Sequence, residues 1–186
     1  HDDVAFEPDS LRALVEEAFR SNAGIIGPKL VSWNDPRRLL QVGMAVDKTG
    51  VAAPLAERGE LDQEQHDAVR DVFVVPGACT VVRADLFEAL DGFDPGIDLL
   101  GDDVDLCWRA HVVGARVLIA PVTRVRHLEA LGERVAIDDR RRQLARHRLR
   151  SSLANYGRWH RIRVIPQAFL FAVVEMAYAV LAGHPD

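Results

Sequence analysis

Acidic and imidazole side chains gather at three places in this sequence of 186 residues, each beside an apolar or helix-forming segment. These side chains are His1, Asp2, Asp3, Asp102, Asp103 and His127. Hard divalent cations take carboxylate oxygens as ligands, and manganese also accepts imidazole nitrogen. Loops at one edge of a sheet can bring such ligands together from distant parts of a chain. The pattern therefore predicts a divalent-cation site.

Each of the three groups also has an ordinary structural explanation. Acids at the start of a helix complement the helix dipole, which alone would explain Asp102 and Asp105. A single histidine after a strand is more often a hydrogen-bonded structural residue than a ligand, and His1 could be a tag remnant. The functional interpretation therefore depends on the three groups meeting in space.

Helices and strands are predicted to alternate along the chain and to position these groups. Five apolar residues at helical spacing follow a capping position at Asp9 or Ser10: Leu11, Leu14, Val15, Ala18 and Phe19. Strands are expected over 24–33 and 38–46, and an irregular excursion over 47–70 contains one short helix around 62–70.

The second half of the body continues the alternation. A β-branched run from residue 71 breaks at Pro76 and Gly77, resumes as a strand and passes into a short helix before Gly92. A helix over 102–113 carries acids at its amino end, and a last strand covers 115–121. This order favours an α/β sheet over a sandwich or a bundle.

Charge and cysteine content restrict the possible partners. Residues 1–139 contain 14 basic and 26 acidic residues, which argues against a body that wraps nucleic acid. Cys79 and Cys107 lack the spacing of a zinc site and are too few for a disulfide framework, so buried free thiols are expected. The hydrophobic fraction of 48% is ample for one buried core.

The C-terminal part differs from the body, and we divide the chain into 1–137, 138–163 and 164–186. Residues 140–163 contain nine arginines and no acid, and 164–186 is predominantly apolar. These arginines would suit anionic headgroups at a membrane surface. Alternatively, the basic helix offsets the acidic body and 164–186 is a buried packing helix. Both interpretations stay open.

Three stretches, in this order, resemble the inverting family 2 glycosyltransferases of the GT-A fold. "HDDVAFEPDSLRALV" is similar to the family's D-x-D-like triplet with its turn and helix. "VPGACTVVRADLFEALDGFDP" resembles the acceptor-side stretch, and "LGDDVDLCWRAHVVGARVLIAPVTRVRH" resembles the "EDVDL" helix, the closing strand and a closing histidine. The resemblance covers roughly residues 1–130.

The resemblance implies an α/β GT-A fold with a mixed sheet, followed by C-terminal helices. Asp3 and His127 match metal positions, and His1 occupies the first place of the triplet, where the family has Asp or Asn. Asp2 and Asp3 fall on the donor side. Because the family places a nucleotide-binding segment before the triplet, we expect the chain to hold only the acceptor half, which could be inactive alone.

On the acceptor side, Asp103 matches the general base, and Asp102 stands where the family commonly has Glu. Acceptor-side positions are expected at four further residues: Gly77, Ala78, Cys79 and Trp108.

The implied reaction moves a sugar, with inversion, from a nucleotide-diphospho-sugar to a hydroxyl of a glycan or lipid-linked acceptor, with Mn²⁺ or Mg²⁺. The implied setting is cell-envelope glycan or glycolipid synthesis on the cytoplasmic face of a bacterial plasma membrane. The alternative is a non-catalytic module with a transferase-like fold that docks on membranes or a partner.

Overall fold

A mixed sheet lies at the centre of the computed structural model, which describes residues 1–130 and 136–181. Two long parallel strands, β2 (Ala23–Ser32) and β8 (Arg116–His127), form its middle. Shorter strands pair with them antiparallel: β1 (Val4–Phe6), β3 (Leu39–Gln41), β6 (Arg70–Asp71) and β7 (Val81–Val82). The predicted α/β class with a mixed sheet is confirmed.

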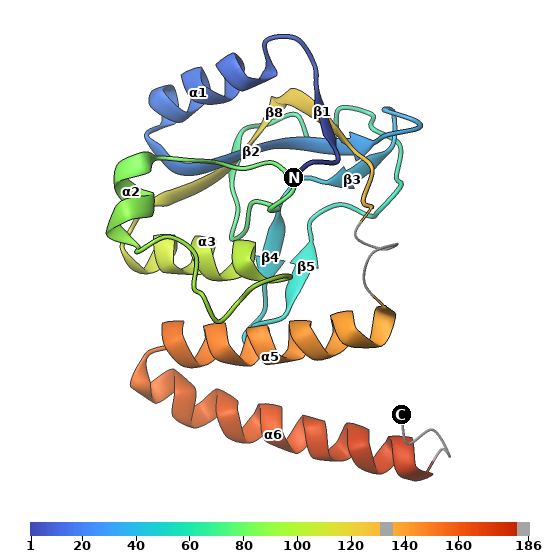
Figure 1. Cartoon of the computed structure of the whole chain (residues 1–186), viewed down its shortest axis with the longest axis vertical. Coiled ribbons are helices and arrows are strands. Elements are labelled where there is room, and N and C mark those ends of the chain that lie inside the picture. The colour runs from blue at the N-terminus through green and yellow to red at the C-terminus, as the bar shows by residue number, and fades with distance from the viewer. Residues whose placement is uncertain (131–135, 182–186) are drawn as a thin grey trace.

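The remaining elements are one small sheet and the helices (Figure 1). The small sheet pairs β4 (Met44–Val46) with β5 (Ala52–Pro54). The helices are α1 (Ser10–Ser21), α2 (Ala84–Ala89), α3 (Asp102–Val112), α5 (Ile137–Asn155) and α6 (Arg158–Leu181).

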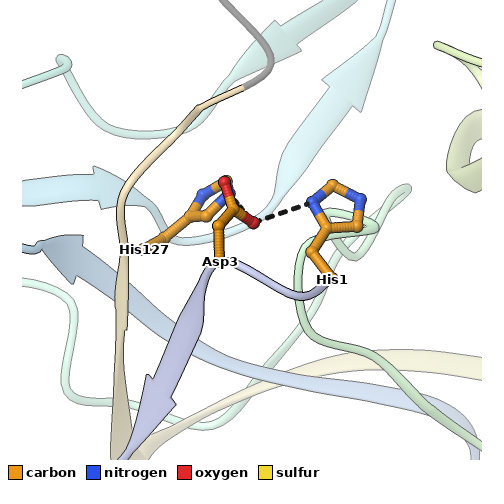
Figure 2. Close-up of side chains that lie close together, drawn as sticks. All are labelled: His1, Asp3 and His127. Atoms are coloured by element: carbon orange, nitrogen blue, oxygen red, sulfur yellow. Dashed lines mark ion pairs between the residues drawn. The ribbon is translucent and has the colours of Figure 1, made fainter. Parts of the chain in front are cut away.

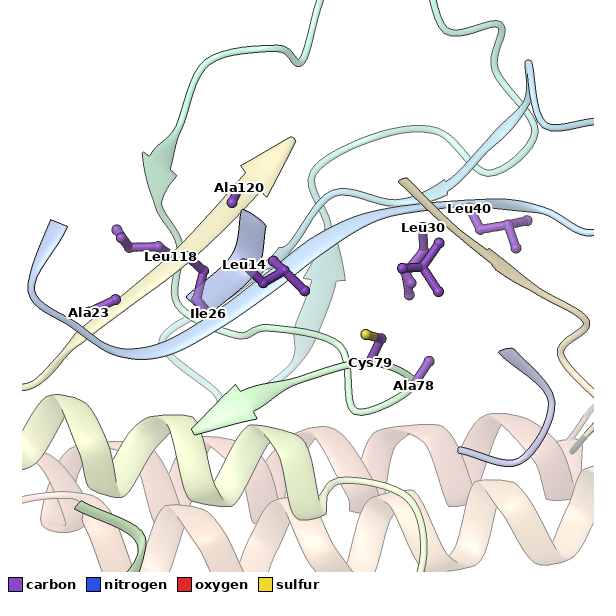
Figure 3. Close-up of a cluster of buried hydrophobic side chains, with 10 residues drawn as sticks. Leu14, Ala23, Ile26, Leu30, Leu40, Ala78, Cys79, Leu118 and Ala120 are labelled. Carbon is purple, nitrogen blue, oxygen red and sulfur yellow. The ribbon is translucent and has the colours of Figure 1, made fainter. Parts of the chain in front are cut away.

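The two faces of the central sheet carry separate cores, because successive residues of a strand point to opposite faces. On one face, Leu14 of α1 packs in a cluster with Ile26 and Leu118 (Figure 3). On the other face, Ile25 and Leu106 of α3 belong to a second cluster. Strand β2 is buried along nearly its whole length, as expected for a strand covered on both faces.

Helix α1 forms as its apolar spacing predicts, but it packs on the sheet through only part of its apolar stripe. Leu14 is fully buried, whereas Leu11 and Phe19 are 57% and 84% exposed. The buried face of the helix instead includes the polar residues Ser10 and Glu17. Periodicity therefore predicted the helix correctly, while its rotation against the sheet was set by packing.

Residues 38–46 and 62–70 differ from their predicted structures. The first segment splits into β3 and β4, which belong to different sheets, because Gly43 between them takes a left-handed backbone with φ of 95°. The second forms turns instead of a helix. Its Asp62 carboxylate lies 2.9 Å from the Nζ of the fully buried Lys29, and Asp67 pairs with the same ammonium group. A buried ammonium needs such partners, so the segment is held beside β2, which carries Lys29.

The two C-terminal helices meet at Tyr156 and Gly157, so α6 runs through the predicted boundary between residues 163 and 164 without interruption. Helix α5 is fastened to the body. The His147 imidazole bonds the Leu100 carbonyl at 2.8 Å, and the Asn155 amide donates to Asp105 of α3 at 3.2 Å. Helix α6 lies outermost (Figure 1). Among the described residues, no helix combines the length and the apolarity needed to cross a bilayer.

Candidate functional site

Two of the three predicted groups meet in one cluster that contains His1, Asp3 and His127 (Figure 2). The Oδ1 atom of Asp3 lies 3.6 Å from the Nδ1 of His1 and 3.3 Å from the Nε2 of His127. One ligand atom from each residue lies within 4.8 Å of the others. The cluster therefore offers two imidazoles and one carboxylate at a separation suited to a single cation.

The sheet positions this cluster. Strand β1 pairs with the end of β8 so that Val4 is opposite His127, which places Asp3 beside the histidine. The second carboxylate oxygen of Asp3 accepts the Ala130 amide at 2.9 Å, which orients the side chain. The backbone nitrogen of His1 donates to the Ala78 carbonyl at 3.0 Å. His1 therefore joins the cluster to the loop that contains Ala78.

A cavity of about 490 Å³ lies beside the cluster. It is lined by His1, Val4, Phe6, Val75, Gly77, Ala78, Cys79, Thr80, Val82, Ala84, Phe87, Phe93, Asp102, Asp103, Leu106 and Cys107. Its volume falls in the range of small-molecule sites. Because both His1 and Asp103 line it, the cavity connects the cation cluster to the third predicted group.

Asp103 is held at the amino end of α3 by two backbone amides. The Gly77 N–H donates to Oδ2 at 2.9 Å, and the Val104 N–H donates to Oδ1 at 2.8 Å. Burial raises the pKa of Asp103 to about 6; the Gly77 hydrogen bond opposes this rise, and the neighbouring Asp102 carboxylate adds to it. A pKa in this range suits a general base that works near neutral pH.

Glycine at position 77 permits the close approach of this loop to α3. A Cβ atom there would lie 3.3 Å from the Cβ of Asp103, which is tighter than ordinary contact. Ala78 and Cys79, two of the residues that the family resemblance places on the acceptor side, also line the cavity. Both cysteines are buried free thiols, as expected, and burial raises the pKa of Cys79 to about 11 and that of Cys107 to about 12.

Trp108 is a correction to the predicted acceptor-side set. It is 6% exposed and packs against Phe73 and Tyr156, at ring separations of 5.5 Å and 4.7 Å. The reason is helical geometry: a residue five positions after Asp103 lies about 140° around the helix from it. Leu106 and Cys107, three and four positions after Asp103, face the cavity instead.

Asp2 is exposed and belongs to neither the cluster nor the cavity lining.

Aromatic side chains at the cavity were missed by the sequence reasoning. Phe6, Phe87 and Phe93 all line it. Phe93 belongs to the "GFDP" end of the stretch that resembles the family's acceptor side, and a phenylalanine between a glycine and an aspartate there was the available sequence signal. Which aromatic residues face a cavity depends on the tertiary arrangement of α2, α3 and the connecting loop.

A family model described as "Glycosyl transferase family group 2" matches residues 1–184. The chain belongs to this family. Among curated relatives, it is 33% identical over 134 residues to the O-antigen biosynthesis protein RfbC of Myxococcus xanthus, covering 69% of this chain and 10% of that protein. It is 34% identical over 90 residues to a pre-mycofactocin glycosyltransferase of Mycobacterium tuberculosis, covering 46% of this chain and 19% of that protein. The chain thus spans a fifth or less of the length of these family members.

The fold of this glycosyl transferase family 2 chain is similar to a solved structure of GalNAc-T7 with UDP, GalNAc and Mn²⁺. The TM-score is 0.50 at 17% sequence identity, over 98% of this chain and 40% of that one. This similarity supports the predicted GT-A fold. The stretches that predicted the family are the same ones that build the cation cluster and the cavity.

Proposed function

We propose that the protein transfers a sugar, with inversion, from a nucleotide-diphospho-sugar to an acceptor hydroxyl in glycan synthesis. One observation carries this proposal: His1 belongs to the cation cluster and also lines the cavity that contains Asp103. The cation cluster, through His1, and the Asp103 carboxylate, which is suited to act as a general base, therefore adjoin the same cavity. Family membership and the functions named for the relatives support the same reaction class.

The cluster fits a divalent cation by the chemistry of its donors. Its carboxylate oxygen lies between two imidazole nitrogens, and all three residues come from backbone fixed by the sheet or by the Ala78 hydrogen bond. His1, Asp3 and His127 would hold the ion, and Mn²⁺ suits this set better than Mg²⁺, which prefers oxygen ligands. When bound, such a cation would neutralise charge that develops on a departing diphosphate.

Asp103 would accept the proton of the acceptor hydroxyl. Its two carboxylate oxygens are fixed by the amides of Gly77 and Val104, so the side chain is oriented before an acceptor enters. Attack by the activated oxygen on the side of the sugar opposite the leaving diphosphate inverts the anomeric centre. Asp102 lines the same cavity, and its charge keeps the pKa of Asp103 raised.

The proposal is tested by titrating the full-length protein, not the acceptor half alone, with UDP in a calorimeter, first with Mn²⁺ and then after removal of the metal by a chelator. UDP is expected to bind in the presence of Mn²⁺ and to lose most of its affinity without it, because the cation offsets the charge of the diphosphate. Equal UDP affinity in both conditions would contradict the assignment of the cluster.

We further propose that the protein works on the anionic cytoplasmic surface of a bacterial plasma membrane, where a lipid-linked acceptor would be encountered. Helix α6 supports this with an exposed apolar face formed by Trp159, Ile162, Pro166, Phe169, Leu170 and Val173. Arg158 and Arg163 are exposed at its amino end. Basic residues beside an exposed apolar helix face, with a tryptophan at the boundary, are typical of a helix that lies in a membrane interface.

Vesicle flotation tests this localisation. The protein is expected to float with vesicles rich in phosphatidylglycerol and much less with phosphatidylcholine. Each arginine near an anionic surface contributes about 1 kcal/mol, so Arg158→Gln with Arg163→Gln should weaken partitioning roughly 30-fold. Arg12→Gln with Arg37→Gln is the matched control, since both residues are exposed on the body. Equal losses in the two double variants would contradict a specific role for α6.

A further inference from the structure

Phe93 is a half-exposed aromatic residue at the cavity that contains Asp103. Its side chain is 51% exposed, and its ring meets Phe87 edge to face, with centroids 5.3 Å apart. Single exposed apolar side chains are common on proteins and need no explanation by themselves. Phe93 differs because one arginine binds the backbone before it and a second arginine binds the side chain of the residue after it.

The first arginine comes from α3. One terminal nitrogen of Arg109 donates to the carbonyl oxygens of Leu90 and Gly92, at 2.6 Å and 2.8 Å. Its Nε donates to Asp105 at 2.7 Å, and Asp105 is itself buried. The backbone before Phe93 is therefore attached to the same helix that carries Asp103.

The second arginine comes from α5. Arg150 donates to both carboxylate oxygens of Asp94, at 2.7 Å and 2.8 Å, and holds the pKa of that carboxyl below its usual range. Asp94 also accepts the Gly96 amide at 2.8 Å. A Cβ atom on Gly96 would lie 2.5 Å from the guanidinium carbon of Arg150, so the arginine packs directly on this backbone. The residue after Phe93 is thus fixed to α5.

This arrangement fixes the backbone that carries Phe93 relative to α3, and so to Asp103, although Phe93 itself is half-exposed. The cavity around it combines apolar surfaces from Phe6, Phe87 and Val82 with polar groups at Thr80 and at the carboxylates. A pyranose ring has the same combination, since one face presents C–H groups and its rim carries hydroxyls. An aliphatic chain would leave the polar groups of this cavity without partners.

We propose that Phe93 is the platform on which the pyranose ring of the acceptor stacks, so that one of its hydroxyls reaches Asp103. This inference rests on the proposed transferase function and specifies its acceptor as a sugar instead of an apolar alcohol. Arg109 and Arg150 are positioning residues that hold the platform. Helix α5 thereby takes part in acceptor binding through Arg150.

Saturation-transfer NMR with methyl glycosides of glucose, galactose and N-acetylglucosamine tests the platform. At least one glycoside is expected to receive saturation mainly on the C–H protons of one ring face. Phe93→Ala should weaken its binding about fivefold, which corresponds to about 1 kcal/mol of lost apolar contact with the sugar face, and Phe93→Trp should restore it. The control is Phe19→Ala, which removes an 84%-exposed phenylalanine from α1, outside the cavity.

The outcomes separate this inference from the proposed function. Sugar binding that is unchanged in Phe93→Ala, or binding of a short prenyl alcohol but of none of the glycosides, would overturn the platform while Mn²⁺-dependent UDP binding persists. Absence of Mn²⁺-dependent UDP binding in the full-length wild-type protein would instead overturn the proposed function. Arg150→Gln should weaken glycoside binding less than Phe93→Ala does, since it loosens the loop but keeps the ring.

Discussion

Replacing Asp103 with asparagine in the full-length protein should lower the turnover of sugar transfer by about 100- to 10,000-fold, the usual contribution of a general base. Asparagine is nearly the same size but cannot accept the proton of the acceptor hydroxyl. The measurement is release of nucleoside diphosphate from a nucleotide-sugar in the presence of acceptor. Mn²⁺ binding should change little, because Asp103 lies outside the cation cluster.

The matched control is Asp98→Asn, which neutralises an 83%-exposed carboxylate in the loop before α3. Its turnover should stay near the wild-type value, and thermal denaturation should show that both variants are folded. Full turnover in Asp103→Asn would remove this residue from the reaction. Another group would then accept the proton of the acceptor hydroxyl.

The pH dependence of turnover should report the same carboxylate. Asp103 must be ionised to accept a proton, so turnover is expected to rise with pH through about 6, the value to which burial raises its pKa, and to level off above it. Asp102→Asn removes a neighbouring negative charge that raises this pKa. The acidic limb of the profile should therefore move to lower pH in that variant. If the acidic limb of the profile stayed at the same pH in Asp102→Asn, the titrating group would be a residue other than Asp103.

Local sequence signals were sufficient for the features that depend on neighbouring residues. Apolar spacing predicted α1, and acids followed by a glycine ten or more residues later predicted α3 with Asp103 at its start. The meeting of His1, Asp3 and His127 was predicted, but strand β1 and the continuation of β8 from residue 121 to His127, which bring these residues together, were not. The family resemblance supplied the roles of these residues, which spacing alone left open.

Features that depend on contacts between distant segments were not predictable in this way. Residues 62–70 have helix-forming composition, yet their carboxylates are drawn to Lys29, a fully buried charge 33 positions away from Asp62. The exposure of Leu11 and Phe19 on α1 also depends on distant contacts, because the sheet beneath the helix determines which of its sides is buried. The roles of Arg109 and Arg150 likewise depend on their contacts with the loop around Phe93, which spacing in the sequence does not reveal.

Mn²⁺ affinity should fall at least roughly 100-fold when Asp3 is replaced by asparagine. Removing a group that merely orients a metal ligand costs 10- to 100-fold in affinity, so losing the ligand itself should reach or exceed the upper value. Asparagine is chosen because its amide oxygen can still accept the Ala130 N–H that orients the side chain. Free Mn²⁺ is counted by electron paramagnetic resonance, since the signal of the bound ion broadens.

Three comparisons make this result specific to the cluster. Asp2→Asn removes the adjacent carboxylate, which lies outside the cluster, and should leave Mn²⁺ affinity nearly unchanged. His127→Ala should lower the affinity as Asp3→Asn does, because its Nε2 lies 3.3 Å from the same carboxylate oxygen. Mg²⁺ should displace Mn²⁺ only at large excess, because two of the three donors are imidazoles. If Asp2→Asn weakened binding as much as Asp3→Asn, the ion would be held by the net charge of the triplet, and the geometry that joins β1 to the end of β8 would have no part in it.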